Sequence, residues 1–436
     1  MCHHLKNVYI IFEESRYARL QASTRERDRI LMATEGAAAR RGPLNDIRVL
    51  EMGQLLAGPF CGQLLADFGA EVIKCEQPGT GDPLRVWGQE KPHGKSLWWP
   101  IVARNKKSLT LNLRTEEGQE IVRELIRSTD ILIENFRPGT MERWNLGYEE
   151  LKKINPRLIM VRVTGFGQTG PYSKRAGYGA IGEAMGGLRY VVGDPSTPPS
   201  RMGISIGDEL AAVYACMGAL MALHARENSG RGQVVDSAIY EAVLAMMEST
   251  VSEYDVAGYV RERTGATLPN VSPSNVFETQ DGKLLLIAAN QDTVFRRLAT
   301  AMGQPELSED ARYATHSARG KNMKELDNKI NDWTRTLDLA TLEELLHENG
   351  VPCGLIYSAA EMVDDPHFKA REAIVELPHR DFGSIRMQNV APRLSDTPGE
   401  IRHVGPELGE HTDEVLSGSL KMSSDRLAQL RAKGVI

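Results

Sequence analysis

The chain has 436 residues, of which 41% are hydrophobic and 25% charged, and its formal net charge at pH 7 is −6. This composition is typical of a globular protein rather than a disordered one, and the length predicts two domains or one large one. The acidic balance argues against a nucleic-acid partner, because domains that bind phosphates are usually basic. No apolar run approaches the roughly 18 uncharged residues of a membrane span, so we expect no membrane partner.

Residues 1–43 precede the globular pattern. They lack the apolar core of a secretory signal and contain acidic residues that mitochondrial transit peptides usually avoid. We expect a flexible N-terminal extension, with Met1 or Met32 as the start. The five scattered cysteines form no C-x-x-C pair, which indicates a reducing, cytoplasmic location, and neither they nor the histidines predict a metal site. The acidic residues of the N-terminal segment make the mitochondrial matrix the less favoured location.

The segment 44–245 alternates short apolar runs with amphipathic stretches. Strands are expected at 47–50, 71–74, 108–111, 131–133 and 158–163, and helices at 59–68 and 116–128. Strands that alternate with helices predict an α/β fold with a mostly parallel sheet and helices on both faces.

Two polar clusters lie next to these strands. Arg104-Asn-Lys-Lys107 precedes one strand, and such a basic cluster is usually a solvated face, although it could also hold phosphates. Asn135-Phe-Arg137 follows another strand, where an ordinary turn and a ligand contact are both compatible with the pattern.

The run Gly165-Phe-Gly-Gln-Thr-Gly170 follows a strand and matches the dinucleotide pattern G-x-G-x-x-G. That fingerprint requires a helix to open among the glycines, yet Pro171 and Tyr172 come next, and no acidic residue follows about 20 positions later. The context argues against a nicotinamide site. A glycine-rich loop after a strand still predicts one wall of a ligand crevice.

Asp208 stands before a long apolar helix that should end near Gly230 and be buried all round. The pattern alone favours a helix N-cap. The same place suits a nucleophile, because the helix dipole and the free amides keep a carboxylate ionised. Asp194 and Glu209 are the competing acids.

The character of the chain changes near residue 270. We expect a linker at 246–269, a small α+β domain at 270–372 with a strand at 284–288, and a segment at 373–436 that returns to the large domain. His411, at the start of a helix expected at 409–417, is the histidine of most interest, and a role in starting that helix is favoured.

Ordered motifs along residues 44–436 together resemble the class III CoA-transferase family, which includes formyl-CoA and carnitine CoA-transferases. The pattern is most similar to succinyl-CoA:glutarate transferases. The motifs are Leu56-Ala-Gly-Pro59, Asp67-Phe-Gly-Ala-Glu-Val-Ile-Lys74, Gly79-Thr-Gly-Asp82, Arg104-Asn-Lys-Lys-Ser108, Glu134-Asn-Phe-Arg-Pro-Gly139, 165–172, Gly207-Asp208, Gly230-Arg-Gly-Gln233, Gly350-Val-Pro-Cys-Gly354 and Leu408-Gly-Glu-His-Thr412.

The resemblance implies that Asp208 is the nucleophile, acting through a mixed anhydride and an aspartyl-CoA thioester. It implies an interlocked, ring-like homodimer in which each subunit has a Rossmann-like large domain and a smaller one. A CoA thioester is then a substrate, with no tightly bound cofactor. The candidate CoA-binding residues are Leu56, Ala57, Arg104, Asn105, Lys107, Asn135, Phe136, Arg137, Phe166 and Tyr178.

Departures from the family pattern bear on the substrate. Leu56 stands where formyl-CoA transferases have Gln, which disfavours formate and oxalate, and Gly179 stands where many transferases have Asp. Tyr178 replaces the histidine base of the racemase branch and is a poor base at neutral pH. Arg175 and Arg201 could meet the distal carboxylate of a dicarboxylic acid or be solvated loop charges.

We therefore predict CoA transfer from an acyl-CoA such as succinyl-CoA to a short dicarboxylate. A 2-methylacyl-CoA racemase and a non-catalytic CoA-binding protein are the alternatives.

Overall fold

The computed structural model describes residues 42–436, so the expected N-terminal extension and the alternative start at Met32 lie outside the described residues, apart from positions 42 and 43. Within the described part, the largest sheet has six strands, all parallel, in the order β3-β2-β1-β4-β5-β6. The strands are β1 (Arg48–Glu51), β2 (Glu71–Glu76), β3 (Lys106–Thr110), β4 (Ile131–Glu134), β5 (Ile159–Thr164) and β6 (Val234–Ala238).

This arrangement confirms the predicted α/β fold with a parallel sheet. The strand order is that of doubly wound sheets, in which the direction of winding reverses between β1 and β4. In such sheets ligands bind outside the carboxyl ends of the strands at the reversal.

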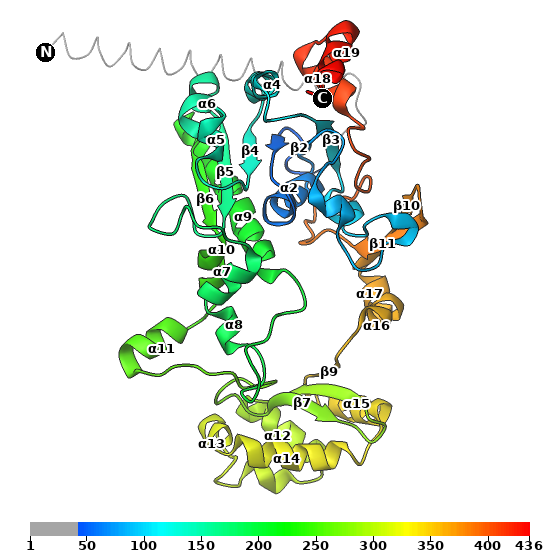
Figure 1. The fold of residues 1–436 in the computed structure, drawn as a ribbon. Coiled ribbons are helices and arrows are strands. Elements are labelled where there is room, and N and C mark those ends of the chain that lie inside the picture. Colours follow the sequence, from blue (N-terminus) through cyan, green and yellow to red (C-terminus); the bar gives the residue numbers. More distant parts are fainter. Residues whose placement is uncertain (1–41) are drawn as a thin grey trace, which may run out of the picture.

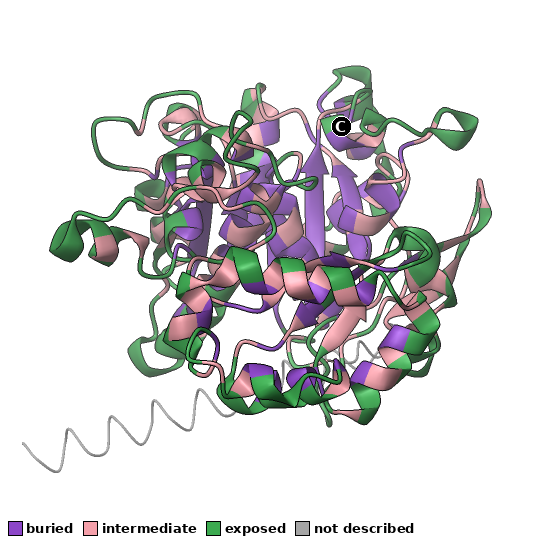
Figure 2. Ribbon diagram, turned by 90° about the horizontal axis from the view of Figure 1, so that it is seen from below, coloured by how far each residue is buried: buried purple, intermediate pink, exposed green. Residues whose placement is uncertain are grey.

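Two cores cover the two faces of the sheet, because successive side chains of a strand point to opposite sides. Val49, Ile131 and Ile133 pack against α2 (Ala57–Asp67) and α9 (Ile206–Ser229). Leu50 and Leu132 pack against α4 (Glu116–Ile126), α6 (Tyr148–Ile154), α18 (Thr412–Leu420) and α19 (Ser424–Ala432). Figure 2 shows the strands in purple inside a shell of less buried helices.

Helix α9 departs from the prediction in two ways. It begins at Ile206, so Asp208 lies inside its first turn and Ser205 occupies the cap position, without a side-chain cap bond. It is also not buried all round: Ala211, Ala215 and other alanines pack on the sheet, whereas apolar residues on other sides are exposed, among them Val213, Met217, Leu220 and Met221.

By length and composition alone, α9 is also the one helix among residues 42–436 that could cross a membrane, with a mean hydropathy of 1.5. This corrects the expectation that no apolar run comes close to that length. Core helices can share this length and composition, and the alanine face of α9 is part of the core that packs on the sheet.

A separate core lies apart from the sheet (Figure 1). Phe277, Leu285 and Leu346 are buried in it, between an antiparallel three-stranded sheet and four helices. The elements are β7 (Ser274–Glu278), β8 (Leu284–Ala288), β9 (Cys353–Leu355), α12 (Asp292–Ala301), α13 (His316–Lys321), α14 (Met323–Thr334) and α15 (Leu339–Glu348).

Two separate stretches of chain join this core to the rest, one after α11 and one through α16 and α17 (Figure 1). The remaining elements are α3 (Trp99–Val102), α5 (Thr140–Arg143), α7 (Gly179–Met185), α8 (Leu188–Val191), α10 (Ile239–Leu244), α11 (Thr250–Ala257), α16 (Ala359–Asp364), α17 (Pro366–Ala370), the hairpin β10 (Ile374–His379) and β11 (Gly383–Gln388), and short 3-10 turns at Pro83–Val86, Pro92–Gly94 and Pro305–Ser308.

The C-terminal segment packs on the parallel sheet. Val415, Leu416, Leu427 and Leu430 are buried in the same core as Leu50, and α18 and α19 lie near α4 in Figure 1. Helix α18 begins three residues later than expected.

His411 directly precedes α18, as expected, but its ring does not cap the helix. Instead, its Nδ1 accepts a hydrogen bond from the Ser108 backbone amide at 3.3 Å. His411 therefore ties the start of α18 to β3.

Candidate active site

A cavity of about 650 Å³ opens at the carboxyl edge of the sheet, at the reversal between β1 and β4. The loops after β1, β4 and β5 supply most of its walls, and Trp87, the loop before α9, the first turn of α9 and the start of α10 supply the rest. The lining residues are 54–57 after β1, Trp87, 135–138 after β4, 163–166 at the end of β5, Ile239 after β6, Ser173, 175–180, Arg201, Ser205 and Asp208. The cavity therefore lies where a doubly wound sheet binds its ligand.

Most of the predicted site residues meet in this cavity. Asp208 lines it together with Leu56, Ala57, Asn135, Phe136, Arg137, Phe166 and Tyr178, and with both loop arginines, Arg175 and Arg201. Sequence reasoning missed several lining residues, among them Gln54, Leu55, Trp87, Thr164, Ser173 and Ser205. Gln54 and Leu55 follow β1 as Asn135 follows β4, so the position after a strand could have identified them.

Asp208 points an unpartnered carboxylate at this cavity. Within residues 42–436 it makes no hydrogen bond or ion pair, and it packs so closely on Gly179 that a methyl group there would lie 2.3 Å from Asp208 Oδ2. Burial raises the pKa of Asp208 to about 6, Glu183 and Glu209 add to the rise, and Arg201 opposes it. The helix terminus therefore does not lower the pKa of Asp208, because burial outweighs it, although a group with this pKa is still mostly ionised at pH 7.

Glu183 of α7 lies behind the first turn of α9. It is 1% exposed, its Oε2 accepts from Arg189 Nε at 3.0 Å, and its Oε1 has no partner.

The competing acids do not line the cavity with Asp208. Asp194 is exposed and bonded to Ser196, and Glu209 lines a second cavity of about 300 Å³.

The loop between β1 and α2 is held in a strained conformation. Leu55 has a φ of 63°, which is uncommon for a residue other than glycine. Its amide donates to Asp82 Oδ1 and Oδ2 at 3.2 and 3.3 Å, and Lys74 Nζ donates to the Gly53 carbonyl at 2.8 Å. The Asn135 amide accepts from Gln54 N at 2.8 Å and donates to Gln54 O at 2.7 Å. Asn135 thus orients this loop within the cavity wall.

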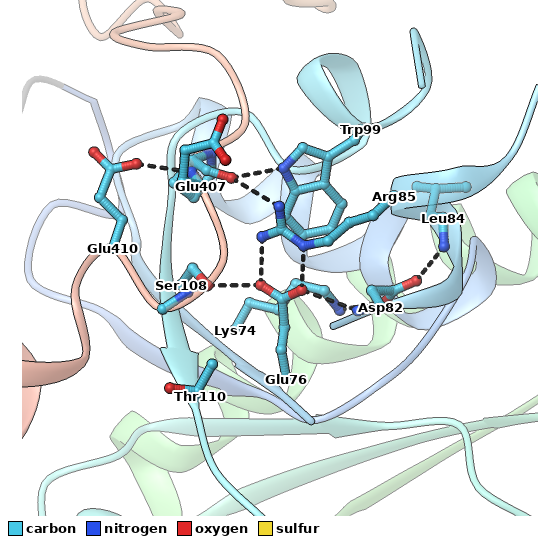
Figure 3. Close-up of polar contacts among 12 residues, drawn as sticks. Lys74, Glu76, Asp82, Leu84, Arg85, Trp99, Ser108, Thr110, Glu407 and Glu410 are labelled. Atoms are coloured by element: carbon cyan, nitrogen blue, oxygen red, sulfur yellow. Dashed lines mark hydrogen bonds and ion pairs between the residues drawn. The ribbon is translucent and has the colours of Figure 1, made fainter. Parts of the chain in front are cut away.

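A buried network of charges supports the same loop, and Figure 3 shows the part of it around Lys74, Glu76 and Asp82. Lys74 pairs with Asp82 at 2.8 Å and with Glu51 at 3.0 Å, and Glu51 also pairs with Lys106 at 2.7 Å. Arg85 pairs with Glu76, whose carboxylate also accepts from Asp82 N. Burial alone would raise the pKa of Asp82, but Lys74 and the amides of Leu84 and Leu55 outweigh it and lower that pKa.

The predicted basic cluster lies outside the cavity. Arg104 is 3% exposed and Lys106 fully buried, so the solvated-face interpretation is wrong. Arg104 pairs with Asp67 at 2.6 Å and donates to Gln388 O, Asn105 donates to Asp67 and Glu400 O, and Lys107 pairs with Glu71 and Glu414. These contacts join β3 to the C-terminal segment. Binding of CoA by Arg104, Asn105 and Lys107 stays a prediction.

The glycine-rich loop after β5 opens no helix, and the next one, α7, begins at Gly179. A methyl group on Gly165 would lie 2.8 Å from the Gly177 Cα, so the two backbones touch where they line the cavity. Tyr178 is 68% exposed directly before α7. The loop therefore forms a wall of the cavity and lacks the dinucleotide geometry. Among residues 42–436, no cluster of three His, Cys, Asp or Glu side chains could hold a metal ion.

Known proteins match nearly all of the described chain. The succinyl-CoA–D-citramalate CoA-transferase of Chloroflexus aurantiacus is 58% identical over 394 residues, which cover 90% of this chain and 98% of that one. The succinate–glutarate CoA-transferase of Agrobacterium fabrum is 37% identical, with 87% and 96% covered. The crystal structure of a CaiB/BaiF family protein from Brucella suis superposes with a TM-score of 0.77 at 34% identity, covering 87% of this chain and all of that one.

Residues 44–412 match the sequence model of CoA-transferase family III. This match and the relatives confirm the resemblance inferred from the ordered motifs. The chain belongs to CoA-transferase family III.

Proposed function

We propose that this protein transfers CoA from succinyl-CoA to a short dicarboxylic acid, with Asp208 as the covalent nucleophile. The observation that carries the proposal is the unpartnered Asp208 carboxylate in the cavity at the sheet reversal of a family III chain. A carboxylate that no cation neutralises is free to attack an acyl carbon. Similar proteins are named for succinyl-CoA or succinate and for citramalate, malate or glutarate, which are all dicarboxylates.

The reaction balances without net proton transfer. Asp208 attacks the thioester carbonyl, the C–S bond breaks, and the CoA thiolate leaves with the electron pair. The thiolate then attacks the Asp208 acyl carbon of the mixed anhydride and releases the donor acid as a carboxylate. The acceptor carboxylate attacks the resulting aspartyl-CoA thioester, and the thiolate takes the new acyl group and frees Asp208. Covalent catalysis of this kind conserves the energy of the thioester.

Two features of the cavity favour acyl transfer over racemisation. A racemase needs a second base beside the aspartate, and no histidine is among the cavity-lining residues of the described chain. Tyr178 holds the place of that base. Turnover with a carboxylic acid acceptor distinguishes a transferase from a racemase and from a CoA-binding protein.

The test uses the purified full-length protein with succinyl-CoA and a panel of mono- and dicarboxylates. We expect Asp208→Asn to abolish transfer, and hydroxylamine added with acyl-CoA to leave a hydroxamate on Asp208 that mass spectrometry detects. Asp194→Asn, in an exposed loop outside the cavity, is the control and should retain full activity. Near-normal transfer by Asp208→Asn would contradict the mechanism, and α-deuterium exchange without transfer would favour the racemase.

We also propose a homodimer, in which a second copy of the chain covers the exposed apolar residues of α9 to α11. These side chains are Val213, Met217, Leu220, Met221, Leu244, Met246, Val251, Tyr254 and Val256. A large exposed apolar surface is unusual for a monomer and marks a binding interface. Light scattering should give twice the chain mass, and Met217→Glu with Met221→Glu should give monomers. A monomeric wild-type protein would contradict this proposal.

A further inference from the structure

The cavity wall carries more positive than negative charge. Besides Asp208, its charged lining residues are Arg137, Arg175 and Arg201. Within residues 42–436, none of these guanidinium groups forms an ion pair with a carboxylate, and Arg175 instead stacks on the Tyr172 ring at 3.6 Å from the ring centroid. Unpaired arginines that face a cavity indicate an anionic ligand.

The three arginines occupy different parts of the wall. Arg137 follows β4, next to Asn135 and Phe136. Arg175 comes from the loop before α7, and Arg201 from the loop between α8 and α9. Arg201 is also the cation that acts electrostatically on Asp208. Because Arg201 and Asp208 line the same cavity, an acid whose reacting end lies at Asp208 can direct its other end toward Arg201.

A dicarboxylic acid in this cavity presents one carboxylate to Asp208 and leaves the other a few ångströms away. The second carboxylate loses water on binding and needs a cation with two parallel donors. A guanidinium has this geometry, and an aromatic ring that stacks on it restricts its orientation. Arg201, with Arg175 held by Tyr172, offers two such groups.

We propose that Arg201, supported by Arg175, binds the distal carboxylate of the acyl group and so selects dicarboxylic over monocarboxylic acids. This inference rests on the proposed CoA-transferase function, and it names the residues that set its substrate class. A monocarboxylate or a half-amide leaves the guanidinium without its anionic partner, which a site built for a charged group rejects.

The experiment compares glutarate with its half-amide, glutaramate, as acceptors from succinyl-CoA. The two acids have nearly the same shape and differ in the distal charge. In the wild type we expect kcat/KM to favour glutarate by about 10- to 100-fold, the range for a hydrogen bond to a charged group. Arg201→Gln should lose that preference by lowering kcat/KM for glutarate while leaving the value for glutaramate within about threefold. Arg175→Gln should have a smaller effect in the same direction.

Two further variants keep the test decisive. Lys174→Gln removes an exposed charge beside Arg175 that does not line the cavity, and it should preserve the preference. Arg201→Lys keeps the charge without the two parallel donors and should retain part of the preference for glutarate over glutaramate. An equal loss on both acceptors in folded Arg201→Gln, judged by circular dichroism, would overturn the inference. If the wild type transferred CoA to no acceptor, the proposed function would fail instead.

Discussion

At the scale of single residues, Asp208 is a nucleophile that must ionise in a place where burial opposes its charge. Burial and the neighbouring Glu183 raise its pKa to about 6. Since only the carboxylate attacks the thioester, kcat/KM for succinyl-CoA should fall about tenfold per pH unit below pH 6. A pH profile of the rate with succinyl-CoA at limiting concentration measures this acidic limb, the fall of kcat/KM toward low pH. A limb near pH 4, the ordinary range of an aspartic acid, would contradict the assignment.

The same raised pKa predicts a gain in stability on substitution. The folded state binds the Asp208 proton more tightly than the unfolded state, so its contribution to stability is present at low pH and is lost as the pH rises through about 6. Asp208→Asn cannot ionise, so at pH 8 its free energy of unfolding should exceed that of the wild type by at most about 3 kcal/mol, and it should unfold at a higher temperature. The difference should vanish near pH 4, and a less stable variant at pH 8 would contradict the burial argument.

The Asp208 carboxylate occupies space that a side chain at position 179 would fill, so Gly179 is needed for its position. A methyl group at this position would lie 2.3 Å from Asp208 Oδ2, a distance that forces one of them to move. We expect Gly179→Ala to lower kcat at least tenfold, because a small displacement of a reacting group costs that much. Gly203→Ala, in a loop where a methyl group meets no atom within 4 Å, is the control and should be nearly neutral.

At the scale of elements, the loop after β1 depends on charges that belong to other strands. Asp82 accepts from the strained Leu55 amide and pairs with Lys74 of β2. Asp82→Asn removes the charge, so the loop should lose its fixed position. We expect kcat per active site, counted by the Asp208 hydroxamate, to fall about 10- to 100-fold. A purely structural role would lower the count of active sites and leave kcat per site unchanged.

The elements also indicate how far the sequence determines the structure. Each predicted strand of the parallel sheet matches an observed strand to within two residues at either end. The reason is clearest for β4, because a strand buried on both faces leaves a continuous apolar run. The start of α9 was misplaced, since Asp208 is a good cap residue but Ser205 holds the cap position.

Two other failures have a common cause, because local patterns do not identify distant partners. Arg104 and Lys106 look like a solvated cluster, and only the fold brings Asp67 and Glu51 to them. Apolar residues on every side of α9 likewise do not distinguish a buried helix from one with an exposed apolar face. Most of the predicted site residues line the cavity, because they follow strands or match family motifs. The structure was needed to show that Asp208 and the cavity arginines form no ion pair.

At the scale of the whole molecule, the parallel sheet with its cores and the separate core at 277–351 are built from different parts of the chain. The last residues of the chain cover one face of the parallel sheet, since Leu430 is fully buried in the core that contains Leu50 and Val122. The core at 277–351 is continuous in sequence and has its own buried residues, such as Leu346. Two cores with separate sets of contacts should respond separately to damage.

We therefore expect Leu430→Ala and Leu346→Ala to destabilise different parts of the molecule, each by about 2 to 5 kcal/mol. Hydrogen exchange followed by mass spectrometry should report faster exchange in α4, β3 and α18 for Leu430→Ala, and in β8, α12 and α15 for Leu346→Ala. Leu430→Ala should also impair transfer, because its core adjoins the strands that carry the cavity loops. If either variant accelerated exchange equally in both regions, the two cores would unfold as one unit, and the separate contacts would not define separate domains.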